Sequence, residues 1–353
     1  MKAQEQRSMV RPTDHKRRSR FVQVLAFSHS TSVSPTWRRT MTISVYFLMW
    51  VLLTVLAPAW IPVAFVIGVF RQSSFIVLRL LVVFWTYFTV ELMGLVAAGT
   101  IYLITPRDVE RRRELFFHLS CWWGSTLFGA VRRLLSLTVS IEGEEKILPA
   151  PVLVFIRHAS IIDTAVPITF ISKPHGLQLR YVFKRELLVD PCVDVAGHVW
   201  PNYFIDRGGS TEEELKGVRQ LAEDLDSQGV LLYPEGTRFT ERKKKIALEQ
   251  LRKHHPELVP IAESYTHCLP PKPGGALTLL DAAPDTDVLI VAHRGLEGLA
   301  EIADLWGGTV VGKAVEIQIW RVPAHDIPEG HDARRRWLFD WWKRVDDFVS
   351  ARS

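Results

Sequence analysis

A run of 28 residues without a charged side chain, from Ile43 to Phe70, constrains the fold of this chain more than any other feature. About 20 apolar residues in an α-helix cross the hydrocarbon core of a bilayer, so the run is long enough to span one. Pro58 and Pro62 lie inside the run, and proline interrupts the hydrogen bonding of a helix interior. The sequence therefore predicts a kinked helix in contact with a membrane.

A second apolar stretch, Leu80 to Ile104, follows after a short polar break and contains one charged residue, Glu91. The two stretches together predict a helical hairpin in or across the membrane. Arginines and lysines are concentrated in residues 1–40 and again at 107–113, on both outer ends of the hairpin. Because cytoplasmic flanks carry the excess of positive charge, both ends are expected in the cytoplasm. The alternative is an amphipathic or re-entrant pair that never crosses.

These observations divide the chain into three parts. We expect a basic flexible tail over residues 1–40, a membrane hairpin of two apolar helices over 41–106, and a domain carrying the chemistry over 107–353. The net charge of +5 is compatible with nucleic acid, an anionic membrane or an anionic substrate. A nucleic-acid partner is disfavoured, because the basic tail precedes an apolar hairpin and has no interleaved aromatic residues.

The three cysteines, Cys121, Cys192 and Cys268, are far apart in the sequence and form no CxxC pair. They therefore indicate neither a disulfide framework nor a cysteine-rich zinc site, and they fit a reducing compartment that faces the cytosol.

The third part alternates between helix-like and strand-like segments. A helix is expected over 114–136, and short β-rich runs occur at 137–141, 151–156, 180–183, 229–233, 288–292 and 314–320. Such alternation is typical of an α/β layered domain, here predicted as a mixed sheet flanked by helices.

A histidine and a carboxylate follow the second of these strands, in the stretch LVFIRHASIIDTAV. Four residues separate His158 from Asp163, and a bend between them can bring the carboxylate to imidazole Nδ1. Nε2 is then left as an outward-facing proton acceptor. This dyad needs no protein nucleophile, because the hydroxyl that it activates can belong to a substrate. The spacing alone is weak evidence, since chance pairs of this kind are common.

Two further strand ends carry charged turns. In YPEGTR, Gly236 permits a tight turn, Glu235 presents a carboxylate, and Arg238 presents a fork suited to phosphate. In YFIDRGG, Asp206 and Arg207 repeat this pattern before two glycines. Ligands bind at strand ends in α/β sheets, so the three turns are expected to form one site.

Four blocks in order give the sequence a specific resemblance. HASIID at 158–163, FKRELLVDPCVDVAGHVWPNYFIDR at 183–207, YPEGTR at 233–238 and HCLPPKPGGA at 267–276 resemble the motifs of the glycerophospholipid acyltransferase family. The family usually has asparagine where this chain has Arg157. The extra cation at that position is consistent with stronger anion binding or with a lowered pKa of the imidazole.

The resemblance implies transfer of an acyl group from acyl-CoA or acyl carrier protein to a lysophospholipid hydroxyl, with 1-acyl-glycerol-3-phosphate the preferred acceptor. His158 and Asp163 are the implied catalytic residues. The implied substrate-binding residues are Ser160, Asp206, Arg207, Glu235, Gly236, Thr237 and Arg238. The expected partners are the acceptor, the acyl donor and membrane lipids, and no permanently bound cofactor or metal is expected.

Two alternatives remain open at this stage. The acceptor can be a lysophospholipid with a different head group, or the protein can be a membrane lipid-binding protein that keeps this fold without catalysis. The sequence carries no GxSxG, HExxH or glycine-rich phosphate loop, which removes the serine-hydrolase, zincin and P-loop interpretations.

Overall fold

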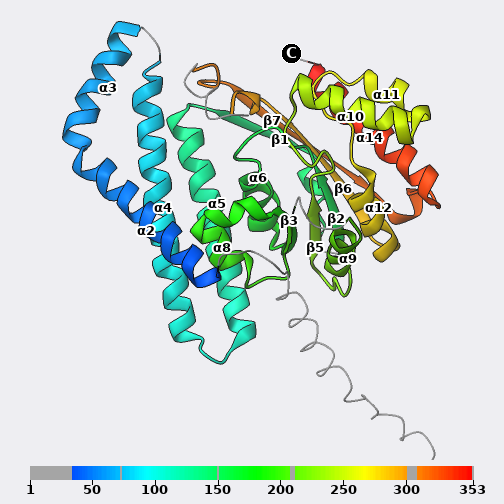
Figure 1. Cartoon of the computed structure of the whole chain (residues 1–353), viewed down its shortest axis with the longest axis horizontal. Helices are drawn as coiled ribbons and strands as arrows, with labels where there is room; N and C mark the ends of the chain where they lie inside the picture. Colours follow the sequence, from blue (N-terminus) through cyan, green and yellow to red (C-terminus); the bar gives the residue numbers. More distant parts are fainter. Residues whose placement is uncertain (1–33, 72–73, 149–150, 207–210, 300–307, 352–353) are drawn as a thin grey trace, which may run out of the picture.

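Seven strands form one mixed sheet in the order β1-β7-β6-β2-β5-β3-β4 (Figure 1). The structure is a computed structural model that describes residues 34–71, 74–148, 151–206, 211–299 and 308–351. The strands are β1 Thr138–Glu142, β2 Val152–Ile156, β3 Leu179–Lys184, β4 Tyr203–Ile205, β5 Gly229–Leu232, β6 Asp287–Arg294 and β7 Ala314–Val322. Six of them lie at the predicted β-rich runs, and β4 is the short strand whose end is predicted in the YFIDRGG segment.

The direction of the strands decides where a site can form. Strands β6, β2, β5, β3 and β4 run parallel to one another, whereas β7 is antiparallel to β6. The central strands β2 and β5 are fully buried and consist of aliphatic residues with one phenylalanine and one glycine, as expected where helices cover both faces of a sheet. The carboxyl ends of five strands therefore meet at one edge.

One face of the sheet packs against the helices α9 Thr211–Leu221, α10 Glu241–His254, α11 Val259–Glu263, α12 Pro273–Ala282 and α14 His331–Ser350. Odd-numbered residues of β2, Leu153 and Phe155, enter this core. The C-terminal helix α14 supplies Trp342, which is fully buried. In Figure 1 these helices lie to the right of the sheet.

The opposite face packs against α5 Val109–Leu134 and against the segment 165–175, which consists of α6 Ala165–Pro167, the π-helix η2 Ile168–Ser172 and α7 Lys173–His175. Val152, Val154 and Ile156 of β2 enter this second core. The helix α8 Pro191–Gly197 lies against α4 beside it. Short 3-10 helices complete the chain: η1 Glu144–Lys146, η3 Arg185–Val189, η4 Pro256–Leu258, η5 Glu297–Leu299 and η6 Ala324–Asp326.

The N-terminal apolar segment forms three helices, α2 Pro35–Val55, α3 Ala57–Arg71 and α4 Ile76–Ile104. The predicted kink is present, because α2 and α3 meet at an angle of 69° just before Pro58. Helix α4 is long and apolar enough to span a membrane, and α2 with α3 would count as a second span only if the bent pair is one. Large hydrophobic side chains of these helices are exposed, among them Phe47, Leu52, Phe65, Phe70 and Leu103.

Helix α2 begins before residue 41, where the sequence predicts the start of the membrane hairpin. Its first residue is Pro35, inside the predicted tail of residues 1–40, and Ser34 caps it by accepting a hydrogen bond from the Trp37 N–H at 3.2 Å. Serine at the cap and proline at the first position both favour a helix start here. The rest of the predicted tail lies outside the described residues.

Two arginines of this first turn fasten α2 to α8. Arg38 makes a bidentate ion pair with Asp194 at 2.9 and 3.0 Å, and Arg39 contacts the same carboxylate at 3.1 Å. The Asp194 side chain is fully buried. The N-terminal helix and the α/β domain are therefore joined by a charge cluster as well as by apolar packing.

Candidate active site

The predicted site residues follow parallel strands of one sheet, of which β2 and β5 are neighbours and β4 is two strands beyond β5. His158 follows β2, the 233–238 turn follows its neighbour β5, and Asp206 follows β4. His293 lies near the end of β6, on the other side of β2. Because these strands are parallel, the turns after them gather at one edge, which is where α/β sheets bind ligands.

The predicted dyad is formed. His158 Nδ1 and Asp163 Oδ2 are 2.9 Å apart. The backbone N–H groups of Ala159 and Ser160 donate to the same Oδ2 at 2.5 and 2.8 Å, which bends the chain between histidine and aspartate into a tight turn. The Ser160 hydroxyl donates to Oδ1. The carboxylate is thereby fixed by its own loop.

Asp163 is held as a carboxylate. Its side chain is fully buried, which on its own would raise its pKa, but the imidazoles of His293 and His158 and the hydroxyl of Ser160 lower the pKa to about 2. An ionised carboxylate at Nδ1 fixes the His158 tautomer with its proton on Nδ1.

The other imidazole nitrogen of His158 is available to a substrate. The His158 side chain is 18% exposed, and Nε2 has no hydrogen-bond partner among the described residues. The Tyr233 ring packs against the imidazole with its centroid at 4.8 Å, and the Tyr233 hydroxyl donates to the Asp163 carbonyl at 3.1 Å. The ring is therefore held between a tyrosine and a carboxylate with its basic nitrogen toward the open side.

Glu235 is predicted to bind substrate, but its carboxylate is buried and binds backbone N–H groups of the protein. The residue is 1% exposed, and its two carboxylate oxygens accept the backbone N–H groups of His158 and Leu269 at 3.1 and 2.9 Å. Burial raises the pKa of Glu235 to about 7, although Arg157 and the two N–H groups act in the opposite direction. Glu235 thus joins three segments of the site and presents no free face to a substrate.

The turn after Glu235 is partly exposed to solvent. Gly236 adopts a φ of +66°, the left-handed conformation that glycine accepts most readily. Thr237 and Arg238 are half-buried, and the Lys243 ammonium contacts the Thr237 hydroxyl and the Arg238 carbonyl, each at 3.1 Å. The Lys243 ammonium therefore lies at the turn that carries Arg238.

Of the third predicted turn, the structure describes Asp206. Its carboxylate pairs with Arg185, at the end of β3, at 2.8 Å, and its N–H donates to Glu214 at 2.9 Å. Arg207, predicted to bind phosphate, lies outside the described residues. Its role stays a prediction.

Arg157 contradicts the expectation of stronger anion binding. Its side chain is 2% exposed and turns inward, toward Glu297 and the carbonyls of His293 and His267. A buried guanidinium that is bound to protein acceptors cannot reach a solvent-borne phosphate.

His293 is a site residue that the sequence analysis does not identify. Its ring is fully buried, with Nε2 3.0 Å from the Arg157 carbonyl and 3.5 Å from Asp163 Oδ1. A signal is present in the sequence, since VAHRG is a further apolar strand that ends in histidine and arginine.

No group of three or more metal-ligating side chains occurs among the residues that the structure describes.

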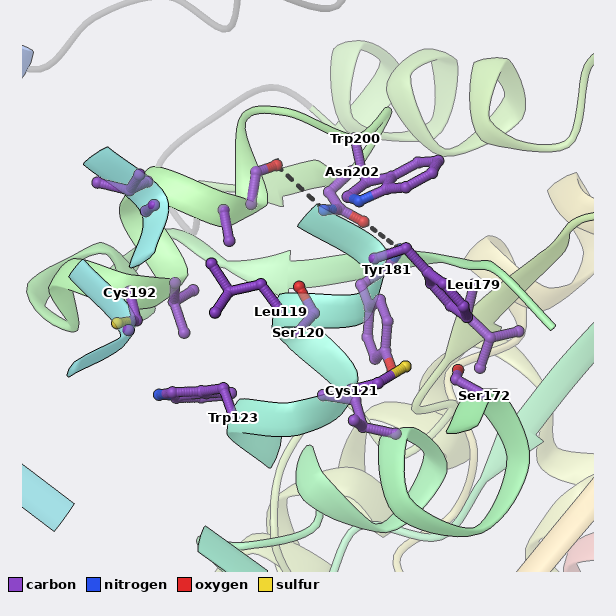
Figure 2. Close-up of a pocket in the computed structure, with 18 of the residues that line it drawn as sticks. Leu119, Ser120, Cys121, Trp123, Ser172, Leu179, Tyr181, Cys192, Trp200 and Asn202 are labelled. Atoms are coloured by element: carbon purple, nitrogen blue, oxygen red, sulfur yellow. Dashed lines mark hydrogen bonds between the residues drawn. The ribbon is translucent and has the colours of Figure 1, made fainter. Parts of the chain in front are cut away.

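An apolar cavity lies between α4, α5, α8 and β3 (Figure 2). Its volume is about 100 Å³, smaller than that of a typical small-molecule site. Tyr181 and Phe183 of β3 line it with stacked rings 4.9 Å apart between centroids. Asn202 closes one side, where it accepts the Tyr181 N–H and donates to the Gly197 carbonyl.

Comparisons with known proteins agree with this geometry. A family model described as Acyltransferase matches residues 138–293. The mouse protein 1-acyl-sn-glycerol-3-phosphate acyltransferase gamma is 27% identical over 181 residues, which cover 47% of this chain and 44% of that protein. The mouse delta form is 27% identical over 182 residues, with 48% and 44% covered. This chain therefore spans less than half the length of these relatives.

A solved structure shares the fold. The 1-acyl-sn-glycerophosphate acyltransferase PlsC from Thermotoga maritima superposes with a TM-score of 0.52 at 17% sequence identity, covering 77% of this chain and 97% of that one. The likeness confirms the predicted α/β fold. The family model and the curated relatives agree with the resemblance to glycerophospholipid acyltransferases that the four sequence blocks carry.

Proposed function

We propose that this protein transfers a fatty acyl group from acyl-CoA, or from acyl carrier protein, to the free hydroxyl of a lysophospholipid, with 1-acyl-glycerol-3-phosphate as the preferred acceptor. The observation that carries the proposal is the His158–Asp163 pair, with its carboxylate buried and Nε2 open. The activity named for the relatives is consistent with it.

In the proposed reaction, His158 Nε2 takes the proton of the acceptor hydroxyl as that oxygen attacks the thioester carbonyl. A carbon–oxygen bond forms, the carbon–sulfur bond breaks, and the departing thiolate receives the proton from the imidazolium. Asp163 stabilises the positive charge on His158 while it exists. General-base catalysis of this kind contributes roughly 10² to 10⁴ in rate, and no acyl-enzyme is required.

The acceptor phosphate is assigned to the cations at the strand ends. Arg238 belongs to the half-buried turn after β5, which directly neighbours β2. A guanidinium binds phosphate through two parallel hydrogen bonds. Arg207, two residues after β4 in the sequence, is assigned the same role, and Gly236 and Thr237 belong to the turn that carries Arg238.

The cavity of Figure 2 is the proposed place for an acyl chain. Val152, Val154 and Ile156 face the same core as Leu179 and Tyr181, and two of these, Leu179 and Tyr181, line the cavity. Because side chains alternate along an extended chain, His158 continues the same face of β2. A chain bound in the cavity would thus approach the site from the side on which the imidazole lies.

We also propose that α2, α3 and α4 hold the protein in a membrane, with the active edge on the cytoplasmic side. Their exposed apolar side chains form a surface that monomeric soluble proteins rarely carry. The protein should remain in the membrane pellet after an alkaline carbonate wash. An engineered cysteine in residues 1–40 that reacts only with reagent added from outside the cell would contradict the orientation.

The decisive experiment is an acceptor panel. Full-length protein in detergent is incubated with radiolabelled acyl-CoA or acyl carrier protein and with lysophospholipids of different head groups, and the products are identified by mass. Acylation of lysophosphatidic acid above the others supports the proposal. Preferential acylation of a lysophospholipid with another head group would identify that lipid as the acceptor. Acceptor binding without acylation by any donor would favour a lipid-binding protein.

A further inference from the structure

The guanidinium of Arg157 is bound entirely within the protein, one residue before the catalytic histidine. Nη1 donates to the His293 carbonyl and to Glu297 Oε1, each at 2.6 Å, and Nη2 donates to the His267 carbonyl at 3.1 Å. These acceptors belong to three separate segments: the end of β6, η5, and the loop before Leu269. Arg157 therefore joins parts of the chain that lie more than 100 residues from it in the sequence.

The contact with His293 is reciprocal and reaches the dyad. The His293 ring donates from Nε2 to the Arg157 carbonyl at 3.0 Å, while Arg157 binds the His293 carbonyl. Burial lowers the pKa of His293, so the ring is neutral near pH 7. The same Nε2 lies 3.5 Å from Asp163 Oδ1, so the position of the ring limits where the carboxylate can lie.

A second route from Arg157 to His158 passes through Glu235. The loop 266–269 is held at His267 O by Arg157, at Leu269 N–H by Glu235, and at three N–H groups by the buried Asp346. The other oxygen of Glu235 accepts the His158 N–H. Acceptance by both oxygens favours the carboxylate over the acid, because protonation adds a donor and weakens one acceptor.

We infer that Arg157 is a positioning residue for acyl transfer: its buried cation favours the ionised form of Glu235, and its fork fixes β6 and the 266–269 loop against the turn that carries His158 and Asp163. The inference rests on the proposed role of the dyad. The charged or titratable groups that face Arg157 are Glu235, Glu297, Cys268 and His293, and those that face Glu235 are Arg157, Asp163 and Cys268.

Two substitutions separate the charge from the fork. Arg157→Gln removes both. Without the cation that lowers it, the pKa of Glu235 rises above about 7, so Glu235 is protonated at neutral pH. In the pH profile of kcat/KM, the midpoint on the acid side should then shift to higher pH by about one unit. The kcat at pH 7 should fall roughly 10²-fold, as expected for a small misplacement of catalytic groups. Arg157→Lys keeps the charge, so its midpoint on the acid side should stay near that of the wild type while kcat falls.

Arg180 provides a matched control. It is also a buried arginine, 6% exposed, whose guanidinium binds the carbonyls of Leu221, Glu223 and Asp224. It lies near the start of β3, at the sheet edge away from the site. Arg180→Gln should cost stability as Arg157→Gln does, with kcat and the pH profile unchanged.

The test measures pH profiles of kcat/KM, thermal unfolding, and amide hydrogen exchange of peptides covering 156–163 and 266–270, all on full-length protein in detergent. We expect faster exchange in both peptides for the Arg157 variants and unchanged exchange for Arg180→Gln. An unshifted midpoint on the acid side in Arg157→Gln, unchanged exchange in these peptides, or loss of the folded state in both Arg157 variants would overturn the inference. A wild type that acylates no acceptor would refute the proposed function, and the exchange data would still decide the role of Arg157.

Discussion

The turns after β2 and β5 lie on neighbouring strands and are built in opposite ways. In the first, Asp163 is fully buried, and its oxygens receive hydrogen bonds from two N–H groups, a hydroxyl and the His158 ring. In the second, Thr237 and Arg238 are half-buried and lie beside the Lys243 ammonium. The first turn is fixed by the protein, whereas the second is open to a ligand.

The difference follows from what each turn is proposed to do. Proton transfer needs a base within hydrogen-bond reach of the reacting hydroxyl, so the His158 imidazole has to be held in a fixed position. Phosphate recognition needs cations that remain accessible until the substrate arrives. Substitutions in the first turn should therefore act on kcat, and substitutions in the second should act on the KM of the acceptor.

His158→Ala removes the base and should have the largest effect, a fall in kcat of at least about 10³-fold. The protein should stay folded, because the ring is partly exposed and at the surface of the core. Single-turnover acylation and thermal unfolding measure the two quantities. Turnover within tenfold of the wild type would mean that His158 is not the base.

Asp163→Asn should lower kcat by roughly 10² to 10⁴, because a neutral amide can stabilise the wrong imidazole tautomer and cannot balance the imidazolium. The KM of the acceptor should change little. The rate of acyl transfer at saturating acceptor is the measurement, with His158→Ala as the reference. An asparagine variant as active as the wild type would show that the buried charge is not used.

Arg238→Ala tests the open turn. The half-buried arginine should contribute about 1.5 to 3 kcal/mol to phosphate binding, so the KM for lysophosphatidic acid should rise roughly 10- to 100-fold. Arg238→Lys should recover part of this, because it keeps the charge without the fork. Titrations of acceptor at fixed acyl-CoA, and the reverse, give both constants. A steep rise in the acyl-CoA KM alone would assign the residue to the donor.

Ser160→Ala should have the smallest effect. It removes one of several donors to Asp163, so we expect a loss of about 1 kcal/mol, roughly fivefold in kcat, with the acceptor KM unchanged. Ser160→Thr keeps the hydroxyl and serves as the control. A rise in the acceptor KM for Ser160→Ala would mean that the hydroxyl contacts substrate, as the family resemblance implies.

The strands and the dyad could be predicted because both depend on local sequence. The apolar runs mark the strands, and His158 and Asp163 are close enough in the chain for a single bend to join them. Parallel strand direction then brings the turn after β5 to the same edge. The YFIDRGG segment was also interpreted as a strand end, although the edge strand β4 is three residues long and carries a weak signal.

The roles of Arg157 and Glu235 could not be predicted, because each depends on where distant segments lie. An arginine beside a histidine gives no indication of whether it faces solvent or the interior. Its direction is set by the His293 and His267 carbonyls, which no local pattern places near it. For the same reason, the composition of residues 1–40 could not reveal that Arg38 and Arg39 bind Asp194.

The cluster of Arg38, Arg39 and Asp194 determines where the chain can be shortened without loss of these ion pairs. Cutting the chain at residue 41 or 107, where composition suggests a boundary, would remove both guanidinium groups and leave the Asp194 carboxylate next to His198 alone, at 3.3 Å. Such a cut takes away the two opposite charges and the hydrogen bonds that hold this carboxylate against α2. The shortest version that keeps both ion pairs should therefore begin at or before Ser34.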